Sequence, residues 1–439
     1  MSFKNETPKD PIGCDLAPDI QLNLNVRGLS PSATVAINER SDQLRTQGLR
    51  IYKMGLGQSP FPVPDIIVDE LKQNAFQKAY LPVKGLPELR HAIAEHHIRE
   101  FGIDCTANDV LIGPGSKELM FILQLVYYGD IVIPTPAWVS YAPQAQIIGR
   151  QVRFLHTHRE NGWRLTPEQL DTLCKSDPSR PRILVLNYPS NPTGTTYSQD
   201  ELKAIAKIAN KYRVIVLSDE IYGKLHHAGK HHSIVPLYPE GTIFSGGLSK
   251  WCGAGGWRLG LFVFPTCLRW LQDAMAAVAS ETFTSTSAPI QYAAVKAFQE
   301  SEDIDRYLYQ ARRILRSIGN KLVSLLKNVG VEVPLPQGGF YLFPDFKKYR
   351  EKLRITTSPE FCEHLLQETG VAILPGRDFG RAPEEMTARL AYVNFDGKKA
   401  LEAASQIPDE QSLNDDFLHA YCAEPLNAVE KLCNWLKSL

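Results

Sequence analysis

The chain has 439 residues, and its 48 lysine and arginine side chains balance 48 aspartate and glutamate side chains. This zero formal charge argues against a protein that binds nucleic acid through bulk positive charge. Hydrophobic residues at 44% and charged residues at 22% are ordinary for a globular protein, and the length suggests about three domains.

The cysteines and the N-terminus bear on the cellular compartment. Eight cysteines are spread along the chain without a CxxC pair, which favours reduced thiols over a disulfide framework. The opening residues MSFKNETPKD contain no apolar signal-peptide core, and the apolar stretch Leu119–Tyr128 is too short to span a bilayer. We therefore expect a soluble, cytoplasmic protein.

Short β-branched runs alternate with amphipathic stretches in the first two thirds of the chain. The predicted strands are Val110–Ile112, Ile131–Ile133, Val152–Leu155, Ile183–Leu186, Val214–Leu217, Ile243–Phe244 and Leu259–Phe264, and the helices between them include Glu88–Glu100, Lys117–Tyr127, Gln199–Lys211 and Leu268–Ala279. Continuously apolar strands are typical of a sheet covered by helices on both faces. We predict an α/β fold with a mainly parallel, seven-stranded sheet, in which ligands bind beyond the carboxyl ends of the strands.

The pattern changes near Ile304, where a long helix is predicted to run to Asn328, followed by a strand in VGVEVP. Further predicted elements are the strands Gly339–Phe343, Val371–Leu374 and Leu390–Val393 and the helices Pro359–Glu368 and Pro425–Lys437. We expect a small α/β domain built from residues 1–57 and 316–439 beside a large domain of residues 58–315. The polar segment Ser405–Ala423 is predicted to be an exposed insertion.

The strongest local feature is the run Gly247-Leu-Ser-Lys250-Trp-Cys-Gly-Ala-Gly-Gly-Trp-Arg258. A glycine-rich loop with two solvated cations would account for it. A lysine flanked by small residues can instead reach an aldehyde and form a Schiff base. An arginine nearby can hold a phosphate through its bidentate fork.

Two polar motifs follow neighbouring predicted strands. Asp219 ends an apolar strand and Tyr222 follows three residues later, while Asn191 lies in the turn Asn-Pro-Thr-Gly. Asp219 as a helix N-cap and Asn191 as a turn residue are the simpler interpretations. Alternatively, the carboxylate keeps a pyridinium nitrogen protonated, and the amide and the hydroxyl contact the same ring.

Weaker signals complete the set. Gly115-Ser116-Lys117 opens a helix after a strand, where free N–H groups favour a phosphate, although Ser116 as a simple N-cap is the plainer interpretation. Trp138 follows a strand and is either a core residue or a platform for a flat ring. Tyr80 and Arg389 have equally ordinary explanations as a packed loop tyrosine and an edge-strand arginine, but arginine also suits a carboxylate.

Taken together, in this order, these stretches resemble the class I aminotransferases, which are fold-type I enzymes dependent on pyridoxal 5′-phosphate. The resemblance runs from about Arg27 to Gly397, and the lysine segment is its most specific motif. One position departs from many relatives, which have a phosphate-contacting serine where this chain has Gly247. That phosphate contact is therefore not expected to be conserved in the same form.

The resemblance implies a role for each motif residue. Lys250 is implied to form the aldimine with the cofactor and to move the proton, and Asp219 to pair with the pyridine nitrogen. The implied cofactor contacts are Asn191 and Tyr222 on the 3′ oxygen, Trp138 on the ring, and Gly115, Ser116, Lys117 and Arg258 around the phosphate. Tyr80 is implied to reach that phosphate from the neighbouring subunit of a homodimer. Arg389 is implied to bind the substrate α-carboxylate, with Gly57 leaving room.

For the substrate, the segment around Ser32 and Thr34 is similar to the entrance segment of the prokaryotic aspartate aminotransferase branch. In that branch these residues and a lysine matching Lys117 contact the distal carboxylate, which favours aspartate and a 2-oxo acid such as 2-oxoglutarate, exchanged in ping-pong half-reactions. The loop Gly57-Gln58-Ser-Pro-Phe61 departs from the branch pattern, so an aromatic or broad-specificity aminotransferase is the alternative.

Other functions remain as further alternatives. A pyridoxal-phosphate-dependent carbon–sulfur lyase would use the same residues, because the shared carbanion can react in several ways. A DNA-binding regulator built on this fold is disfavoured by the zero net charge and by the short stretch before Arg27. No metal site is expected, because the histidine pairs His96-His97, His226-His227 and His231-His232 are adjacent residues whose side chains point apart. We expect most of them at the surface or in loops.

Overall fold

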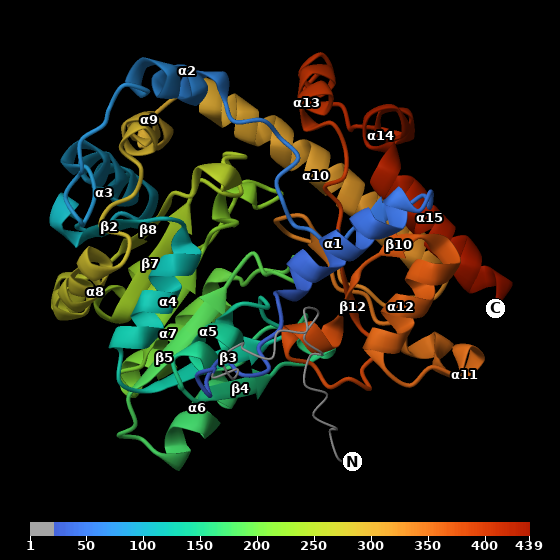
Figure 1. The fold of residues 1–439 in the computed structure, drawn as a ribbon, viewed down its shortest axis with the longest axis horizontal. Coiled ribbons are helices and arrows are strands. Elements are labelled where there is room, and N and C mark those ends of the chain that lie inside the picture. The colour runs from blue at the N-terminus through green and yellow to red at the C-terminus, as the bar shows by residue number, and fades with distance from the viewer. Residues whose placement is uncertain (1–21) are drawn as a thin grey trace, which may run out of the picture.

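The computed structural model describes residues 22–439, and a seven-stranded sheet lies at its centre (Figure 1). In the order β2-β8-β7-β6-β5-β3-β4, the strands are β2 (Val110–Gly113), β8 (Gly260–Val263), β7 (Thr242–Gly247), β6 (Ile215–Asp219), β5 (Arg182–Asn187), β3 (Asp130–Thr135) and β4 (Val152–His156). Strand β8 runs antiparallel to both β2 and β7, and the other neighbouring pairs are parallel. The predicted α/β fold and its mainly parallel sheet are confirmed.

Helices cover both faces of this sheet. The helices of the sheet region are α2 (Asp65–Asn74), α3 (Pro87–Phe101), α4 (Ser116–Val126), α5 (Tyr141–Ile147), α6 (Pro167–Ser176), α7 (Gln199–Lys211), α8 (Arg269–Glu281) and α9 (Ala288–Phe298). Successive side chains of β2 point to opposite faces of the sheet. Leu111 packs with α4 and α8, whereas Val110 and Ile112 pack with α3. This burial on both faces explains why the strands are apolar without alternation.

The C-terminal part (residues 330–439) packs with the N-terminal segment. Its strands are β9 (Tyr341–Leu342), β10 (Val371–Ala372), β11 (Leu374–Pro375) and β12 (Ala388–Ala391), and its helices are α11 (Arg350–Leu353), α12 (Ser358–Thr369), α13 (Gly397–Ser405), α14 (Asp415–Tyr421) and α15 (Ala423–Ser438). From the N-terminal segment come α1 (Ala33–Thr46) and β1 (Tyr52–Lys53). Strand β1 pairs in parallel with β10, which joins the two ends of the chain in one layer.

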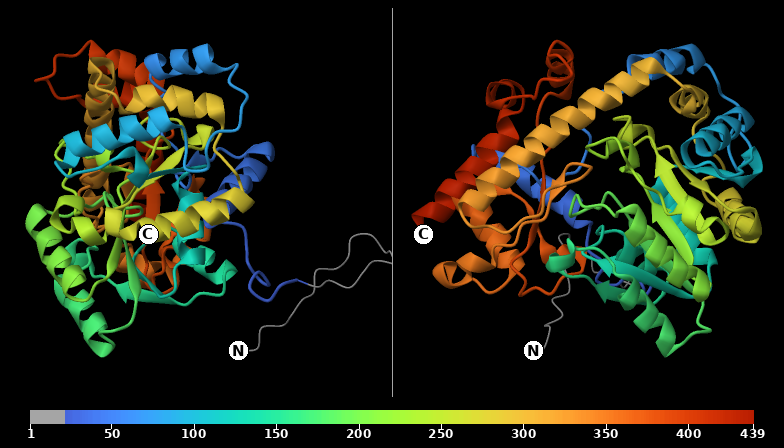
Figure 2. Two further views of the ribbon diagram at one scale, coloured as in Figure 1. Left: turned by 90° about the vertical axis from the view of Figure 1, so that its left-hand side faces the viewer. Right: turned by 180° about the vertical axis from the view of Figure 1, so that it is seen from behind.

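The long helix α10 (Glu302–Asn328) links these two regions, and it runs diagonally across the back of the molecule (Figure 2). Its start lies near α2 and α9, and its end packs against α15. Residue 315, the predicted domain boundary, lies inside this unbroken helix. The exact division into domains stays a prediction.

Some expectations from the sequence need correction. The VGVEVP segment forms no strand and contributes only an isolated bridge between Glu332 and Asp345. The segment Ser405–Ala423 is not wholly exposed, because α14 buries Phe417 and Leu418 in the main core. The guanidinium of the buried Arg313 donates hydrogen bonds to main-chain carbonyls of Ile407 and Pro408, in the loop that precedes α14. Acidic residues on the outer face of this short helix masked its apolar face in the sequence.

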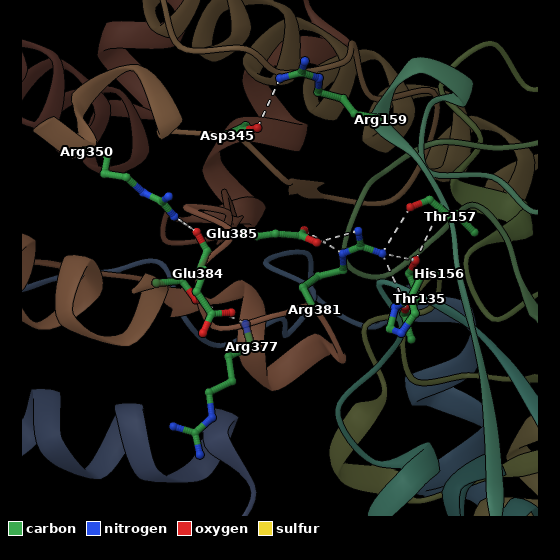
Figure 3. Close-up of polar contacts among 11 residues, drawn as sticks. Thr135, His156, Thr157, Arg159, Asp345, Arg350, Arg377, Arg381, Glu384 and Glu385 are labelled. Carbon is green, nitrogen blue, oxygen red and sulfur yellow. Dashed lines mark hydrogen bonds and ion pairs between the residues drawn. The ribbon is translucent and has the colours of Figure 1, made fainter. Parts of the chain in front are cut away.

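A second buried arginine connects the C-terminal part to the edge of the sheet (Figure 3). The Arg381 guanidinium donates to the carbonyl oxygens of Thr135 and Thr157, at 2.9 and 3.1 Å, and to both carboxylate oxygens of Glu385. Its cation also lies 4.9 Å from the centre of the Trp163 ring. Three kinds of contact on one buried cation therefore hold the strand ends against the C-terminal part.

Candidate active site

A cavity of about 470 Å³ lies at the carboxyl ends of β5 and β6, between the sheet and the C-terminal part. Of the residues selected from the sequence, those that line it are Ser32, Thr34, Gly57, Ser116, Lys117, Trp138, Asn191, Asp219, Tyr222, Lys250, Arg258 and Arg389. Gly115 lies directly behind this wall, and Tyr80 is away from it, with 90% of its surface exposed. Residues from stretches far apart in the sequence thus meet in one place.

The carboxylate of Asp219 is buried in the cavity wall at the end of β6. It accepts a hydrogen bond of 2.5 Å from the Tyr141 hydroxyl, and Ser245 lies at 3.5 Å. Burial raises the pKa of Asp219 to about 6, and these hydrogen bonds oppose the rise. The side chain is thus an ionisable acid in a low-dielectric place, which favours a cationic partner inside the cavity.

Lys250 faces Asp219 across the same cavity. Its ammonium donates a 2.8 Å hydrogen bond to the carbonyl oxygen of Gly57 and makes no ion pair within the described part of the chain. Burial, together with the positive charges of Arg389 and Arg258, lowers the pKa of Lys250 to about 8. A lower pKa gives this amine a much larger neutral, nucleophilic fraction near neutral pH than an ordinary lysine has.

Cationic groups gather at the N-terminus of α4. Gly115 is the N-cap and Ser116 the first helical residue, so the interpretation of Ser116 as the N-cap is wrong. A Cβ atom on Gly115 would lie 2.3 Å from an Arg258 nitrogen, which shows how closely the arginine approaches the helix end. Burial and the charge of Arg258 lower the pKa of Lys117. Helix N–H groups and two cations together form a seat for a dianion such as a phosphate.

Arg389 lies on the opposite side of the cavity and is almost fully buried, not a surface arginine. Its guanidinium donates to the Asn191 side-chain oxygen at 3.0 Å and to the main-chain carbonyl of Gly55. The guanidinium carbon also lies 4.7 Å from the centre of the Tyr341 ring. In the described residues this cation has no carboxylate partner, and its Nε has no hydrogen-bond partner. A buried cation in this state favours a carboxylate ligand.

Glycine at position 57 is required by packing. A Cβ atom there would lie 1.8 Å from the hydroxyl oxygen of Tyr341, which in turn is 2.9 Å from the Tyr222 hydroxyl. The two tyrosines are buried and lie between Asp219 and Arg389 along the cavity wall. A larger residue than glycine would displace this tyrosine pair.

The remaining predicted residues form the rim. Ser32, just before α1, and Thr34 line the same cavity as Lys117. The Lys117 ammonium lies 5.3 Å from the centre of the Trp138 ring, so these two side chains from separate elements are in contact distance. A cation, two hydroxyls and an indole are therefore all part of the cavity lining.

Several lining residues were missed by the sequence reasoning. Tyr141 begins α5 only three residues after Trp138, and Tyr341 lies in a strand that was predicted without a function. Asn187 donates to the main-chain carbonyl of Asp219, and its oxygen accepts from the N–H of Asn191. Ser249 lines the cavity one residue before the lysine. Asn187 and Ser249 lie inside motifs already recognised, so their positions could have been included.

Gly247 and the histidines also receive a structural explanation. A Cβ on Gly247 would lie 2.7 Å from the carbonyl oxygen of Leu259, so the residue is confined by the neighbouring strand. The expectation that most paired histidines lie at the surface or in loops is wrong for His97, which is buried within α3, whereas His226 and His227 lie in a loop and are also buried. His227, for example, lies between two main-chain carbonyl oxygens.

Among residues 22–439, no helix is long and apolar enough to cross a membrane. The same residues contain no group of three or more histidine, cysteine or acidic side chains suited to hold a metal ion.

Comparison with known proteins identifies the family. The profile of the family described as aminotransferase class I and II matches residues 50–407. Aspartate aminotransferase of Geobacillus stearothermophilus is 34% identical over 395 residues, covering 88% of this chain and 97% of the relative. An asparagine–oxo-acid transaminase of Streptococcus mutans is 33% identical, covering 85% of this chain and 94% of the relative.

Solved structures agree with this similarity. An aspartate aminotransferase from Thermus thermophilus with maleate has a TM-score of 0.79 at 30% identity, and the match covers 88% of this chain and 98% of that one. The family profile, the length of the matches and the shared fold all indicate the same relationship. The chain belongs to the class I and II aminotransferase family and is a transferase.

Proposed function

We propose that the protein is a pyridoxal-phosphate-dependent aminotransferase that moves the amino group between aspartate and a 2-oxo acid such as 2-oxoglutarate. The single observation that supports it most is the cavity that joins a low-pKa lysine, Lys250, to a buried carboxylate, Asp219. The family assignment makes such a cofactor the expected one.

The residues present fit this cofactor. The α4 N-terminus with Lys117 and Arg258 suits its phosphate, the Asp219 carboxylate suits its pyridine nitrogen, and Trp138 offers a flat face for its ring. The close approach of Arg258 to Gly115 leaves no space for a side chain there, as expected of a cradle for a phosphate. When bound, the cofactor supplies an aldehyde and an electron sink.

The chain's own groups then have separate tasks. The amine of Lys250 would hold the cofactor, and it would accept and return the proton at the substrate Cα. The ionised Asp219 holds a proton on the ring nitrogen, and Tyr141 keeps that carboxylate oriented. Asn191 and Tyr222 contact the ring oxygen. Arg389, which lines the cavity and donates a hydrogen bond to Asn191, would bind the substrate α-carboxylate.

Aspartate is supported by the rim of the cavity. Ser32, Thr34 and Lys117 all line the cavity, and two hydroxyl donors and an ammonium suit a second carboxylate. Several relatives are named as aspartate aminotransferases, and the relative from Thermus aquaticus is named as a probable aspartate/prephenate aminotransferase. Names of this second kind support the alternative of a broader or aromatic specificity.

A homodimer and a cytoplasmic location belong to the same proposal. Tyr80 is 90% exposed and Phe76 on the same segment is 75% exposed, so both are available to a second copy of the chain. In the proposed dimer, the Tyr80 hydroxyl reaches the phosphate seat of the neighbouring subunit. The described cysteines are all unpaired thiols, which supports a reducing compartment.

The proposal is tested by mixing the purified holoenzyme with single amino acids and 2-oxoglutarate. Aspartate should be used best, and Lys250→Ala should abolish turnover while the matched surface variant Lys230→Ala remains active. Preference for phenylalanine or alanine would favour the broad-specificity alternative. Release of pyruvate and ammonia without an oxo-acid acceptor would favour the carbon–sulfur lyase.

The rim is tested separately. Thr34→Val removes one hydroxyl donor to the second carboxylate and should raise KM for aspartate roughly tenfold or more, with a smaller effect on alanine. Thr46→Val, at the exposed far end of the same helix, is the control. Equal effects on aspartate and alanine would contradict the role of Thr34.

A further inference from the structure

A second cavity of about 200 Å³ lies away from the lysine, between α3, α10 and the end of β6. Its inner wall is aromatic and is formed by Phe101, Phe244, Trp251 and Phe298. The charged side chains of Glu100, Lys224, Asp305 and Arg312 also line it. An aromatic wall with charges of both signs is the composition of a small-molecule site rather than of a core defect.

The four charged side chains are not paired with one another. Burial lowers the pKa values of Lys224 and Arg312. The negative charges of Glu100 and Asp305 act in the opposite direction, but they do not outweigh burial. No ion pair within 4 Å joins any of the four within residues 22–439. Two cations and two anions therefore surround a cavity without neutralising each other by direct contact.

Two polar atoms at the cavity are buried and without a partner. They are the Arg312 Nε and the Nδ1 of His231. The other ring nitrogen of His231 lies 2.7 Å from the Glu220 carboxylate, which also accepts from Ser233 and Tyr188. Glu220 is thus fully satisfied by the protein, whereas the histidine and the arginine retain unused hydrogen-bonding capacity.

The remaining titratable groups do not change this charge balance. Burial lowers the pKa of His96 to about 3 and that of His97 to about 4, so both are neutral at pH 7. Lys224 lies over the Trp251 ring, 5.1 Å from its centre, which holds the ammonium at the aromatic wall. The free charges are therefore one ammonium, one guanidinium and two carboxylates.

We propose that this second cavity binds a free α-amino acid with an apolar or aromatic side chain, as a zwitterion, at a site separate from the catalytic one. The ligand carboxylate would lie between Lys224 and Arg312, and its ammonium would face Glu100 and Asp305. The side chain would pack on the aromatic wall. The small volume fits one amino acid and not a peptide, and the proposal is independent of the catalytic function.

Location gives such a ligand a route to the catalytic residues. Glu220 directly follows Asp219, and Trp251 directly follows Lys250, so the two cavities share segments of chain. A ligand that orders these segments contacts the neighbours of both residues without entering the first cavity.

The test is calorimetric titration of the holoenzyme with N,N-dimethyl-L-phenylalanine. This probe keeps both charges, but its tertiary amine cannot condense with an aldehyde, so it does not react at Lys250. One binding event per chain is expected. Lys224→Met and Asp305→Asn should each weaken it roughly tenfold or more, because each removes one charged contact. The nearby exposed positions provide the controls Lys230→Met and Asp303→Asn, which should not change it.

Two charge-deleted probes define the ligand class. 3-Phenylpropionate lacks the ammonium and N,N-dimethylphenethylamine lacks the carboxylate, and each should bind at least tenfold more weakly. Equal binding of either probe would overturn the zwitterion assignment. Absence of binding, or binding that persists in both Lys224→Met and Asp305→Asn, would overturn the site. If Lys224→Met does not fold, the exposed Asp305 still provides the decisive variant.

Discussion

Replacement of Asp219 by asparagine should stabilise the cofactor-free protein against unfolding. The same substitution should abolish turnover by the holoenzyme. Burial raises the pKa of this carboxyl from 3.8 to about 6, and one pKa unit corresponds to about 1.36 kcal/mol. An ionised Asp219 thus costs the fold about 3 kcal/mol at neutral pH. Asparagine avoids this cost, but it cannot hold a proton on a pyridine nitrogen.

The sign of this effect fixes its pH range. Below pH 4 the carboxyl is protonated in both the folded and the unfolded chain, so the cost is absent. As pH rises from about 4 to 6, the folded protein retains a proton that the unfolded chain has lost, and the wild type loses stability relative to Asp219→Asn. Above pH 7 the difference should be constant at about 3 kcal/mol.

The assay is urea unfolding of both cofactor-free proteins between pH 4 and 8. The change with pH in the difference between their unfolding free energies isolates the protonation of Asp219 from any packing effect of the amide. Asp303→Asn, at an exposed position, is the control and should show no such change. A difference between wild type and Asp219→Asn that stays the same from pH 4 to 8 would refute the reasoning.

Three further perturbations test other parts of the structure. In the cofactor-free protein, Lys250 has a pKa of about 8, so its rate of labelling by a small amine-reactive reagent should rise with a pH midpoint near 8. Mass spectrometry measures the labelling, and a midpoint above 10 would contradict the burial of this amine. Gly57→Ala should cost about 1–3 kcal/mol in urea unfolding and lower kcat/KM, because its Cβ meets Tyr341. Arg381→Met should destabilise the protein by roughly 3 kcal/mol, and the exposed Arg377→Met should have almost no effect in the same unfolding assay.

The sheet could be predicted from the sequence because its strands are buried on both faces. Continuous apolar runs such as Ile183–Leu186 give a strong signal, and the amphipathic helix Gln199–Lys211 was located with both ends correct. The short strands of the C-terminal part were harder. Two-residue pairings such as β10 and β11 depend on partners far along the chain, so a single apolar run, Val371–Leu374, could not show that it divides between them.

The site could be predicted only as far as its residues belong to recognisable motifs. Lys250 and Asp219 follow strands whose carboxyl ends meet, so their convergence was expected. Tyr141 and Tyr341 could not be found in this way, because each reaches the cavity from an element with no motif of its own. The burial of Arg389 also depends on tertiary packing. Its guanidinium reaches the Gly55 carbonyl oxygen only when the N-terminal segment packs against the C-terminal part.

The antiparallel course of β8 has a consequence for how the site is assembled. Because Gly247 pairs with Gly260, the chain between β7 and β8 turns back at the edge it has just reached, and both Lys250 and Arg258 stay within this one loop. A parallel β8 would have required a crossover to the far edge of the sheet. Contacts between residues close in sequence form with a small loss of chain entropy. The β7–β8 hairpin thus brings Lys250 and Arg258 together through contacts that are local in sequence. Asp219 and Asn191 reach the site only when strands far apart in the sequence pair in the sheet.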